Sequence, residues 1–350
     1  MTEVPAAGDT EPPDDGSARR PVDASRRRPP TGEAVTAIES QLRAMRSDAE
    51  QHLAHARAEF DQANERIKER TGRDLIVASA IGLAIGVVVI ASLIFVKALF
   101  VVFAAAAVGL AIFEFSRALQ VAGRRVDVWP QLVVGTLLLL SGFFVGLWMH
   151  WVAVIAAVAI VVVWRLLGQM AARDGRTYLE VIGDVLVAAF VQLYLPFLGS
   201  MSTILLSENR GEWWVLAFLI VAVVSDTGAY VSGLTFGRGG RHPMAPRISP
   251  KKTWEGFAGA FVAALVAGVL LAVLMLQVPW WAGLVFGAVV LATATVGDLG
   301  ESMLKRDLGI KDMSSWLPGH GGVLDRLDSI LPSATAALAL FYLLSPLGAS

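Results

Sequence analysis

The residues of this chain that are best suited to chemistry lie close together, in the run SMLKRDLGIKDMSSWLPGHGGVLDRLD at positions 302–328. Its cations can neutralise phosphate oxygens. Its carboxylates can hold Mg²⁺, which binds one or two protein carboxylates together with phosphates and water. The candidate catalytic residues are Lys305, Arg306, Lys311, His320, Asp325 and Asp328. Fixed cations beside clustered carboxylates predict a site for an anionic, metal-bound and phosphate-rich substrate.

A histidine and two glycines stand in the middle of this run. His320 can donate a hydrogen bond, and at Gly321 and Gly322 the backbone can approach a phosphate closely because no Cβ is in the way. A merely solvated, charged loop would not need these residues. Ser302 and Lys305 also fit the S-x-x-K pattern of acyl-serine enzymes, but the companion motifs S-D-N and K-T-G are missing, which argues against that chemistry.

Two further carboxylates lie at or near the ends of apolar stretches. Asp226 occurs in VAVVSDTGAYVSG and Asp298 occurs in TATVGDLGESMLKR. A carboxylate in or beside a membrane span is costly unless it is paired or functional. We therefore expect both to be functional. The alternatives are a local helix cap and an ion pair with a basic loop residue.

The segment RISPKKTWEG, residues 247–256, combines cations with hydroxyl groups and flexible backbone. Its hydroxyls and backbone amides suit phosphate binding, although the G-x-x-x-x-G-K-[ST] spacing of a Walker A loop is absent. The alternative is a basic loop that only sets membrane topology, which would explain the charge but not the mixture of Ser, Pro, Thr and Gly. The candidate substrate-binding residues here are Ser249, Lys251, Lys252 and Thr253.

The composition is that of a membrane protein. Hydrophobic residues make up 55% of the 350 residues, charged residues only 17%, and the mean hydropathy is +0.61. Soluble domains carry about 25% charged residues. The absence of cysteine excludes disulfides, thiolate zinc sites and a cysteine nucleophile. No early apolar stretch precedes a small-residue cleavage site, so we expect no signal peptide.

Hydropathy predicts an all-α polytopic membrane protein with about nine transmembrane helices. The apolar run from Leu75 to Phe113 contains one ionisable residue, Lys97. As a single helix it would be roughly 58 Å long, about twice the ~30 Å hydrocarbon core, so it must form two spans. The other predicted spans lie at about 128–147, 150–170, 181–203, 213–235, 256–277, 280–298 and 330–347.

The distribution of Lys and Arg predicts the orientation. With the N-terminus inside, the outer loops hold only Lys97 and Arg210, whereas every inner loop carries basic residues. Such an excess marks the cytoplasmic side, so we expect the N-terminus inside and the C-terminus outside. The inner loops predicted at about 236–255 and 299–329 are the ones rich in Gly, Pro and charge. The candidate site is therefore expected to face the cytoplasm.

Three regions follow from these patterns. Residues 1–32 are rich in Pro and charge and poor in large hydrophobes, which predicts a disordered tail. Residues 33–73 place apolar side chains at spacings of three and four, which predicts an amphipathic cytoplasmic helix. That helix could form a coiled coil, lie on the membrane or pack against loops. Residues 74–350 are expected to form a transmembrane catalytic domain.

The order S-x-x-K-R-x4-K-D-x-S-x2-L-P-x-H-G-G-x2-D-R-x-D in residues 302–328 resembles the signature of the phosphatidate cytidylyltransferases, also called CDP-diacylglycerol synthases. No position of the pattern departs from it. The similarity extends to SDTGAY (225–230), SPKKTWEG (249–256) and GDLGES (297–302), and to the many-span layout. It does not cover residues 1–73.

This resemblance implies a nucleotidyltransferase that converts CTP and phosphatidate into CDP-diacylglycerol and pyrophosphate with Mg²⁺, for phospholipid biosynthesis. Asp226, Asp298 and Asp325 would hold one or two divalent ions, and a monovalent ion is a further candidate. The substrate-binding residues would be Ser249, Lys251, Lys252, Thr253, Ser302, Gly321, Gly322 and Arg326. The family also implies a homodimer in the bacterial cell membrane, in contact with membrane lipid. No nucleic-acid partner is expected.

Three alternative functions fit the sequence less well. A transporter would place ionisable residues near mid-bilayer on broken helices, often in two repeated halves, whereas here the charge gathers at one face and no repeat is found. A polyprenol kinase or another CTP-dependent lipid enzyme resembles the family more distantly, and the full 302–328 signature argues against it. A non-enzymatic scaffold would leave that signature unexplained.

Overall fold

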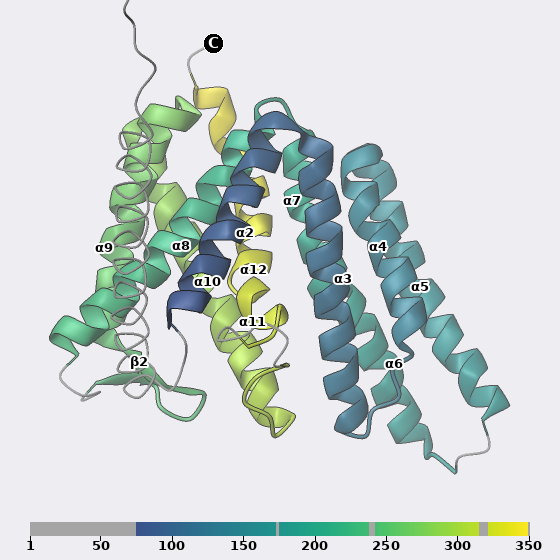
Figure 1. The fold of residues 1–350 in the computed structure, drawn as a ribbon. Helices are drawn as coiled ribbons and strands as arrows, with labels where there is room; N and C mark the ends of the chain where they lie inside the picture. The colour runs from purple at the N-terminus through teal and green to yellow at the C-terminus, as the bar shows by residue number, and fades with distance from the viewer. Residues whose placement is uncertain (1–74, 173–174, 238–241, 315–320, 349–350) are drawn as a thin grey trace, which may run out of the picture. The chain divides into compact units, whose positions relative to one another are not determined.

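The computed structural model describes residues 75–172, 175–237, 242–314 and 321–348. The predicted disordered tail at 1–32 and the predicted amphipathic helix at 33–73 lie outside these residues and stay predictions. His320, a candidate catalytic residue, also lies outside them. The described part is helical throughout, apart from one short hairpin and the connecting segments (Figure 1).

Seven helical segments of the described chain are long and apolar enough to cross a membrane. They are α3 (Lys97–Val121), α5 (Leu147–Ala171), α6–η1–α7 (Tyr178–Ser207), α8 (Gly211–Phe236), α9–η2 (Trp254–Leu276), α10 (Trp280–Asp307) and α11–α12 (Leu324–Leu347). Two further apolar helices, α2 (Leu75–Phe95) and α4 (Val128–Phe144), are shorter. The predicted all-α membrane fold, with nine helical segments between Leu75 and Leu347, is confirmed in the described residues.

Some of these segments consist of more than one helical piece. The third comprises α6 (Tyr178–Gln192), the π-helical turn η1 (Leu193–Phe197) and α7 (Leu198–Ser207). The segment that starts with α9 (Trp254–Leu271) ends in a second π turn, η2 (Ala272–Leu276). The last contains α11 (Leu324–Leu327), α12 (Ile330–Leu344) and the 3-10 turn η3 (Ser345–Leu347).

Small residues bring α8, α9 and α10 into close contact. A Cβ at Gly228 would lie 2.7 Å from Cβ of Ala263, and a Cβ at Gly259 would overlap Ser232. A Cβ at Gly283 would overlap the carbonyl oxygen of Gly268 on the neighbouring helix. Membrane helices associate through such small residues because lipid provides no hydrophobic driving force between them. The three helices that carry the motifs SDTGAY, SPKKTWEG and GDLGES are thereby packed together.

The basic segment 247–256 is not a loop but the second strand of a hairpin that runs directly into α9. Strand β1 (Pro243–Ala245) pairs antiparallel with β2 (Ser249–Thr253), with Pro243 opposite Thr253. Thr253 caps α9, since its hydroxyl oxygen accepts a hydrogen bond from the amide of Gly256 at 3.1 Å. The cap fixes the direction in which the strand enters the helix.

The prediction that residues 299–329 form one loop was wrong for its first part. Helix α10 continues to Asp307, so Glu301, Ser302, Lys305 and Arg306 lie on successive helical turns. Asp298 and Asp226 likewise lie inside α10 and α8 rather than at their ends. Hydropathy indicates where the apolar part of a helix ends. The backbone hydrogen bonds of the helix can continue through polar residues beyond that point, so the helix can be longer than its apolar part.

A buried ion cluster joins α5 to α6 and to the segment just before α6. Asp184 is fully buried and pairs with Arg165 at 2.8 Å and with Arg176 at 2.5 Å. It also accepts a hydrogen bond from the amide of Arg125 at 3.1 Å. Buried charges of this kind need partners, so the cluster fixes the helix ends that precede the catalytic half of the chain.

Candidate active site

A cavity of about 690 Å³, lined by both polar and apolar residues, lies between α8, α9, α10 and the hairpin. It gathers candidate residues that the sequence places in three separate motifs. Those that line it are Asp226, Lys251, Lys252, Thr253 and Asp298. Segments that are far apart along the chain therefore form one site, as the family resemblance implied.

Asp298 is the best-connected carboxylate of the cavity. It forms an ion pair with Lys252 from β2, and its Oδ1 accepts a hydrogen bond from the hydroxyl of Ser302 at 3.4 Å. Both side chains of the ion pair are about 30% exposed, so the pair is open to exchange with a ligand. The predicted substrate-binding Ser302 is itself buried and contacts Asp298.

The first turn of α9 forms the wall that can bind phosphate. Thr253 and Gly256 line the cavity at the start of this 18-residue helix, where the positive end of the helix dipole favours an anion. Lys251 and Lys252 immediately precede this turn. His242 anchors the other side of the hairpin through a 2.5 Å contact from Nδ1 to Oε1 of Glu255. The lysines and the positive end of the helix are thus presented together.

The remaining cavity wall is apolar. Phe257, Leu291 and Ala260 contribute to it, as do Tyr230 and Leu234 of α8, whose side chains are 65% and 69% exposed. Because these two residues line the cavity and also face outward from the helices, the wall continues onto the apolar outer surface of α8. One cavity therefore presents both a polar floor and an apolar side.

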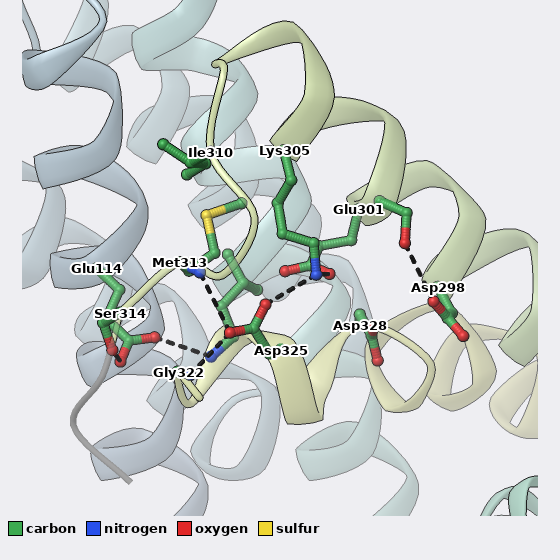
Figure 2. A network of polar contacts seen from close by, with 12 residues as sticks. Glu114, Asp298, Glu301, Lys305, Ile310, Met313, Ser314, Gly322, Asp325 and Asp328 are labelled. Carbon is green, nitrogen blue, oxygen red and sulfur yellow. Dashed lines mark hydrogen bonds and ion pairs between the residues drawn. The ribbon is translucent and has the colours of Figure 1, made fainter. Parts of the chain in front are cut away.

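Beside the cavity, a second cluster of charged residues centres on Lys305. Its ammonium group lies 2.5 Å from Oε2 of Glu301 and 2.8 Å from Oδ1 of Asp325, which joins α10 to α11 (Figure 2). Glu301 is fully buried, and Asp328 is 8% exposed nearby. Three largely buried carboxyl groups thus surround one lysine in a region from which water is mostly excluded.

Asp325 also organises the backbone around it. Its Oδ2 accepts hydrogen bonds from the amides of Gly322 at 2.7 Å and Met313 at 3.2 Å (Figure 2). Gly321 adopts φ +82°, a conformation that favours glycine. A Cβ at Gly322 would lie only 2.8 Å from Oε2 of Glu114. The two glycines predicted to bind phosphate are therefore required by close backbone approach to carboxylates.

Glu114 of α3 is a residue of this site that was not predicted from the sequence. It is 3% exposed and accepts hydrogen bonds from the hydroxyl of Ser314 at 2.5 Å and from the amides of Val323 and Leu324 at 3.0 and 2.9 Å. The predicted span ended at Phe113, which placed Glu114 in a loop. Helix α3 continues to Val121, so Glu114 lies inside a span. An acidic residue inside a membrane span indicates a functional site.

Some predicted residues lie outside the cavity. Lys311 is exposed between α10 and α11, and Ser249 is half-buried at the start of β2. Arg306 is exposed and its guanidinium contacts the carbonyl oxygens of Ile248 and Ile310 at 3.4 and 3.3 Å. Arg326 is exposed, and its positive charge acts on the carboxyl group of Asp226. The structure therefore brings some of the predicted cationic residues into the lining of the cavity and leaves the others outside it.

The carboxylates fit a divalent metal by chemistry and charge. Among the described residues no three His, Cys, Asp or Glu side chains are close enough to form a complete metal site. Mg²⁺ does not need one, because it commonly takes one or two protein carboxylates plus substrate phosphates and waters. Asp226 and Asp298, which line the same cavity, are the pair of carboxylates that could hold it.

The chain is similar to known cytidylyltransferases over most of its length. The model of the Cytidylyltransferase family matches residues 76–344. A protein of Mycobacterium bovis named phosphatidate cytidylyltransferase is 39% identical over 291 residues, which cover 79% of this chain and 90% of that protein. Proteins of the same name from Mycobacterium tuberculosis and Brucella suis are 39% and 33% identical, over 79% and 68% of this chain and 84% and 81% of their own lengths.

Proposed function

Because the chain belongs to the cytidylyltransferase family, we propose that the cavity between α8, α9 and α10 is where it transfers the cytidylyl group of CTP to phosphatidate. The chain is a membrane-embedded nucleotidyltransferase with CDP-diacylglycerol synthase activity. The function predicted from the sequence is thereby confirmed, and a polyprenol kinase or a transporter is not favoured. The assignment of this activity to individual residues is the proposal.

The reaction joins two polyanions. A phosphate oxygen of phosphatidate attacks the α-phosphorus of CTP, a new P–O bond forms as the bond to the β-phosphate oxygen breaks, and pyrophosphate leaves. Catalysis of such transfers consists mainly of positioning and charge neutralisation. A competent site must therefore present cations and amides to both substrates and must admit a lipid from the side.

The observation that carries the proposal is the composition of one cavity. Lys251, Lys252 and the first turn of α9 supply the positive side, and Asp226 and Asp298 supply the carboxylates opposite. We assign the triphosphate of CTP to the α9 side, where the two lysines meet the positive end of the helix dipole. The apolar wall that continues onto α8 suits the acyl chains of phosphatidate, whose headgroup then reaches the same polar floor.

The family generally uses a divalent metal, and we propose that Asp226 and Asp298 hold Mg²⁺ here. Mg²⁺ would neutralise phosphate charge and orient the triphosphate. Lys252, which pairs with Asp298, would engage phosphate oxygens once its partner is otherwise occupied. Lys305 and Asp325 keep the segment around Gly322 next to the cavity. A monovalent ion at the remaining carboxylates is a further candidate.

The chain is a multi-pass membrane protein, and we propose the bacterial cell membrane as its location. The excess of Lys and Arg in the loops at the hairpin end supports a cytoplasmic active site, with the N-terminus inside and the C-terminus outside. CTP would then arrive from the cytoplasm and phosphatidate from the adjacent leaflet. A homodimer is proposed from family membership alone.

The decisive test is an assay of the purified full chain with labelled CTP, phosphatidate and Mg²⁺. Formation of labelled CDP-diacylglycerol with stoichiometric pyrophosphate is expected. ATP in place of CTP is the nucleotide control, and a polyprenol in place of phosphatidate is the acceptor control. Consumption of CTP with the polyprenol but not with phosphatidate would overturn the proposal.

A further inference from the structure

A second groove, of about 420 Å³, lies between α3, α4 and α5, and α4 packs against both of its neighbours (Figure 1). It is formed by the last turns of α3 and the first turns of α4, together with Trp164 of α5. Among the described residues it shares none with the catalytic cavity. Its volume is typical of a site for a small ligand, and the proposed reaction gives it no role.

Arg117 is the one cation among the described residues that line this groove. Its guanidinium lies over the ring of Phe113, with Cζ 5.5 Å from the ring centroid, and Nη1 donates a hydrogen bond to Oε1 of Gln120 at 3.2 Å. The side chain is exposed and forms no ion pair within the part of the chain that the structure describes. Stacking on an aromatic ring orients the guanidinium plane and leaves its other N–H groups available for a phosphate.

The carboxylate of the groove is bonded elsewhere. Oδ2 of Asp127 accepts a hydrogen bond from Nε1 of Trp164 at 3.1 Å, which holds it against α5. The connection between α3 and α4 adds two exposed arginines, Arg124 and Arg125, so that residues 115–130 contain three arginines and one aspartate. This end of the helices therefore carries excess positive charge, and basic residues at a membrane surface attract anionic lipid.

The apolar side of the groove continues along two helices. Trp129, Val133 and Leu137 follow one another at a spacing of four on α4, and Ile160 and Trp164 have the same spacing on α5. Each of the five side chains is at least half exposed. Residues four apart lie on one face of a helix, and indoles are enriched where membrane and water meet. The cation is therefore next to an apolar surface that runs from the helix ends toward their middles.

We propose that this groove binds an anionic phospholipid of the adjacent leaflet, separately from the substrate lipid. The guanidinium of Arg117 donates to the phosphate, the indoles of Trp129 and Trp164 contact the glycerol region, and the acyl chains lie along α4 and α5. A free phosphate or nucleotide would leave the exposed apolar surface uncovered, whereas a phospholipid meets both the charge and the apolar surface. The inference goes beyond the proposed function and does not depend on it.

Native mass spectrometry of the purified full chain in detergent tests the site, with phosphatidylglycerol and phosphatidylcholine of matched acyl chains as probes. Arg117→Gln should weaken binding of phosphatidylglycerol about fivefold, the effect of one basic residue near an anionic headgroup, and should leave binding of phosphatidylcholine unchanged. Arg117→Lys keeps the charge and should lose less. Arg210→Gln is the matched control, because Arg210 is exposed next to α8 and bonds Oε1 of Gln277, away from the groove.

Fluorescence quenching locates the bound lipid in a protein that keeps Arg117, so it tests the inference even where Arg117→Gln lowers stability. Phosphatidylglycerol with brominated acyl chains should quench the parent more than brominated phosphatidylcholine does, and replacing both Trp129 and Trp164 by Phe should remove that difference.

Three results would overturn the inference. The first is an unchanged affinity of Arg117→Gln for phosphatidylglycerol. The second is a loss of that affinity in Lys252→Gln alone, which would place the lipid in the catalytic cavity. The third is a shift from dimer to monomer in Arg117→Gln without a change in lipid affinity, which would assign the groove to a second copy of the chain.

Discussion

The ammonium group of Lys305 lies 2.8 Å from Oδ1 of Asp325 and 2.5 Å from Oε2 of Glu301, so a single side chain joins α10 to the start of α11 (Figure 2). Asp325 uses its other oxygen for two backbone amides, those of Gly322 and Met313. The geometry of the 302–328 signature therefore depends on one cation placed between two carboxylates.

Asp325→Asn should lower turnover about 100-fold or more, comparable to the loss of one preorganised polar group in other active sites. An amide cannot accept both the Lys305 ammonium and the backbone amides. The folded protein should still be recovered from the membrane, as measured by yield and melting temperature. Asp307→Asn is the control, because Asp307 is exposed at the end of α10. Near-normal turnover of Asp325→Asn would remove Asp325 from the site.

Glu114→Gln should loosen the backbone at residues 321–324 and lower kcat/KM about tenfold. The substitution places an NH₂ group near donors that now share two carboxylate oxygens, namely the Ser314 hydroxyl and the amides of Val323 and Leu324. Faster hydrogen exchange at these amides, measured beside activity, would show the cause. Ser314→Ala removes only one of the three contacts and should have a smaller effect. Unchanged exchange in Glu114→Gln would contradict this explanation.

Asp298→Asn should raise the Mg²⁺ concentration needed for half-maximal activity by at least about tenfold, since Mg²⁺ prefers charged oxygen ligands. Removal of divalent ions by a chelator should abolish activity in both the parent and the variant. Asp127→Asn is a suitable control, because Asp127 bonds the indole of Trp164 away from the cavity. An unchanged Mg²⁺ dependence would mean that Asp298 serves only to hold Lys252.

Asp184→Ala should destabilise the fold without acting on the chemistry. Arg165 is 4% exposed, and losing its fully buried partner leaves a desolvated charge. Breaking such a pair costs about 3–5 kcal/mol. A clear drop in melting temperature is expected, with normal kcat for the protein that remains folded. Glu180→Gln on the same helix changes only an exposed capping box and should lower the melting temperature much less than Asp184→Ala.

Much of the candidate site could be predicted from the sequence because its polar residues occur in short motifs. Asp226, Asp298, Lys251, Lys252 and Thr253 were all chosen from local patterns and all line one cavity. Glu114 could not be found this way, since its partner Leu324 is 210 positions distant.

By itself the sequence determined the membrane fold, the number of helical segments and the family, because hydropathy, charge asymmetry and motif order are local properties of the chain. Only the tertiary structure decided that α10 runs on to Asp307, that the basic segment is a strand leading into α9, and that Lys305 stands between Glu301 and Asp325. These features depend on which side chains meet across helices. The close packing of α8, α9 and α10 at Gly228, Gly259 and Gly283 is a further feature of this kind, and no local pattern of polarity encodes it.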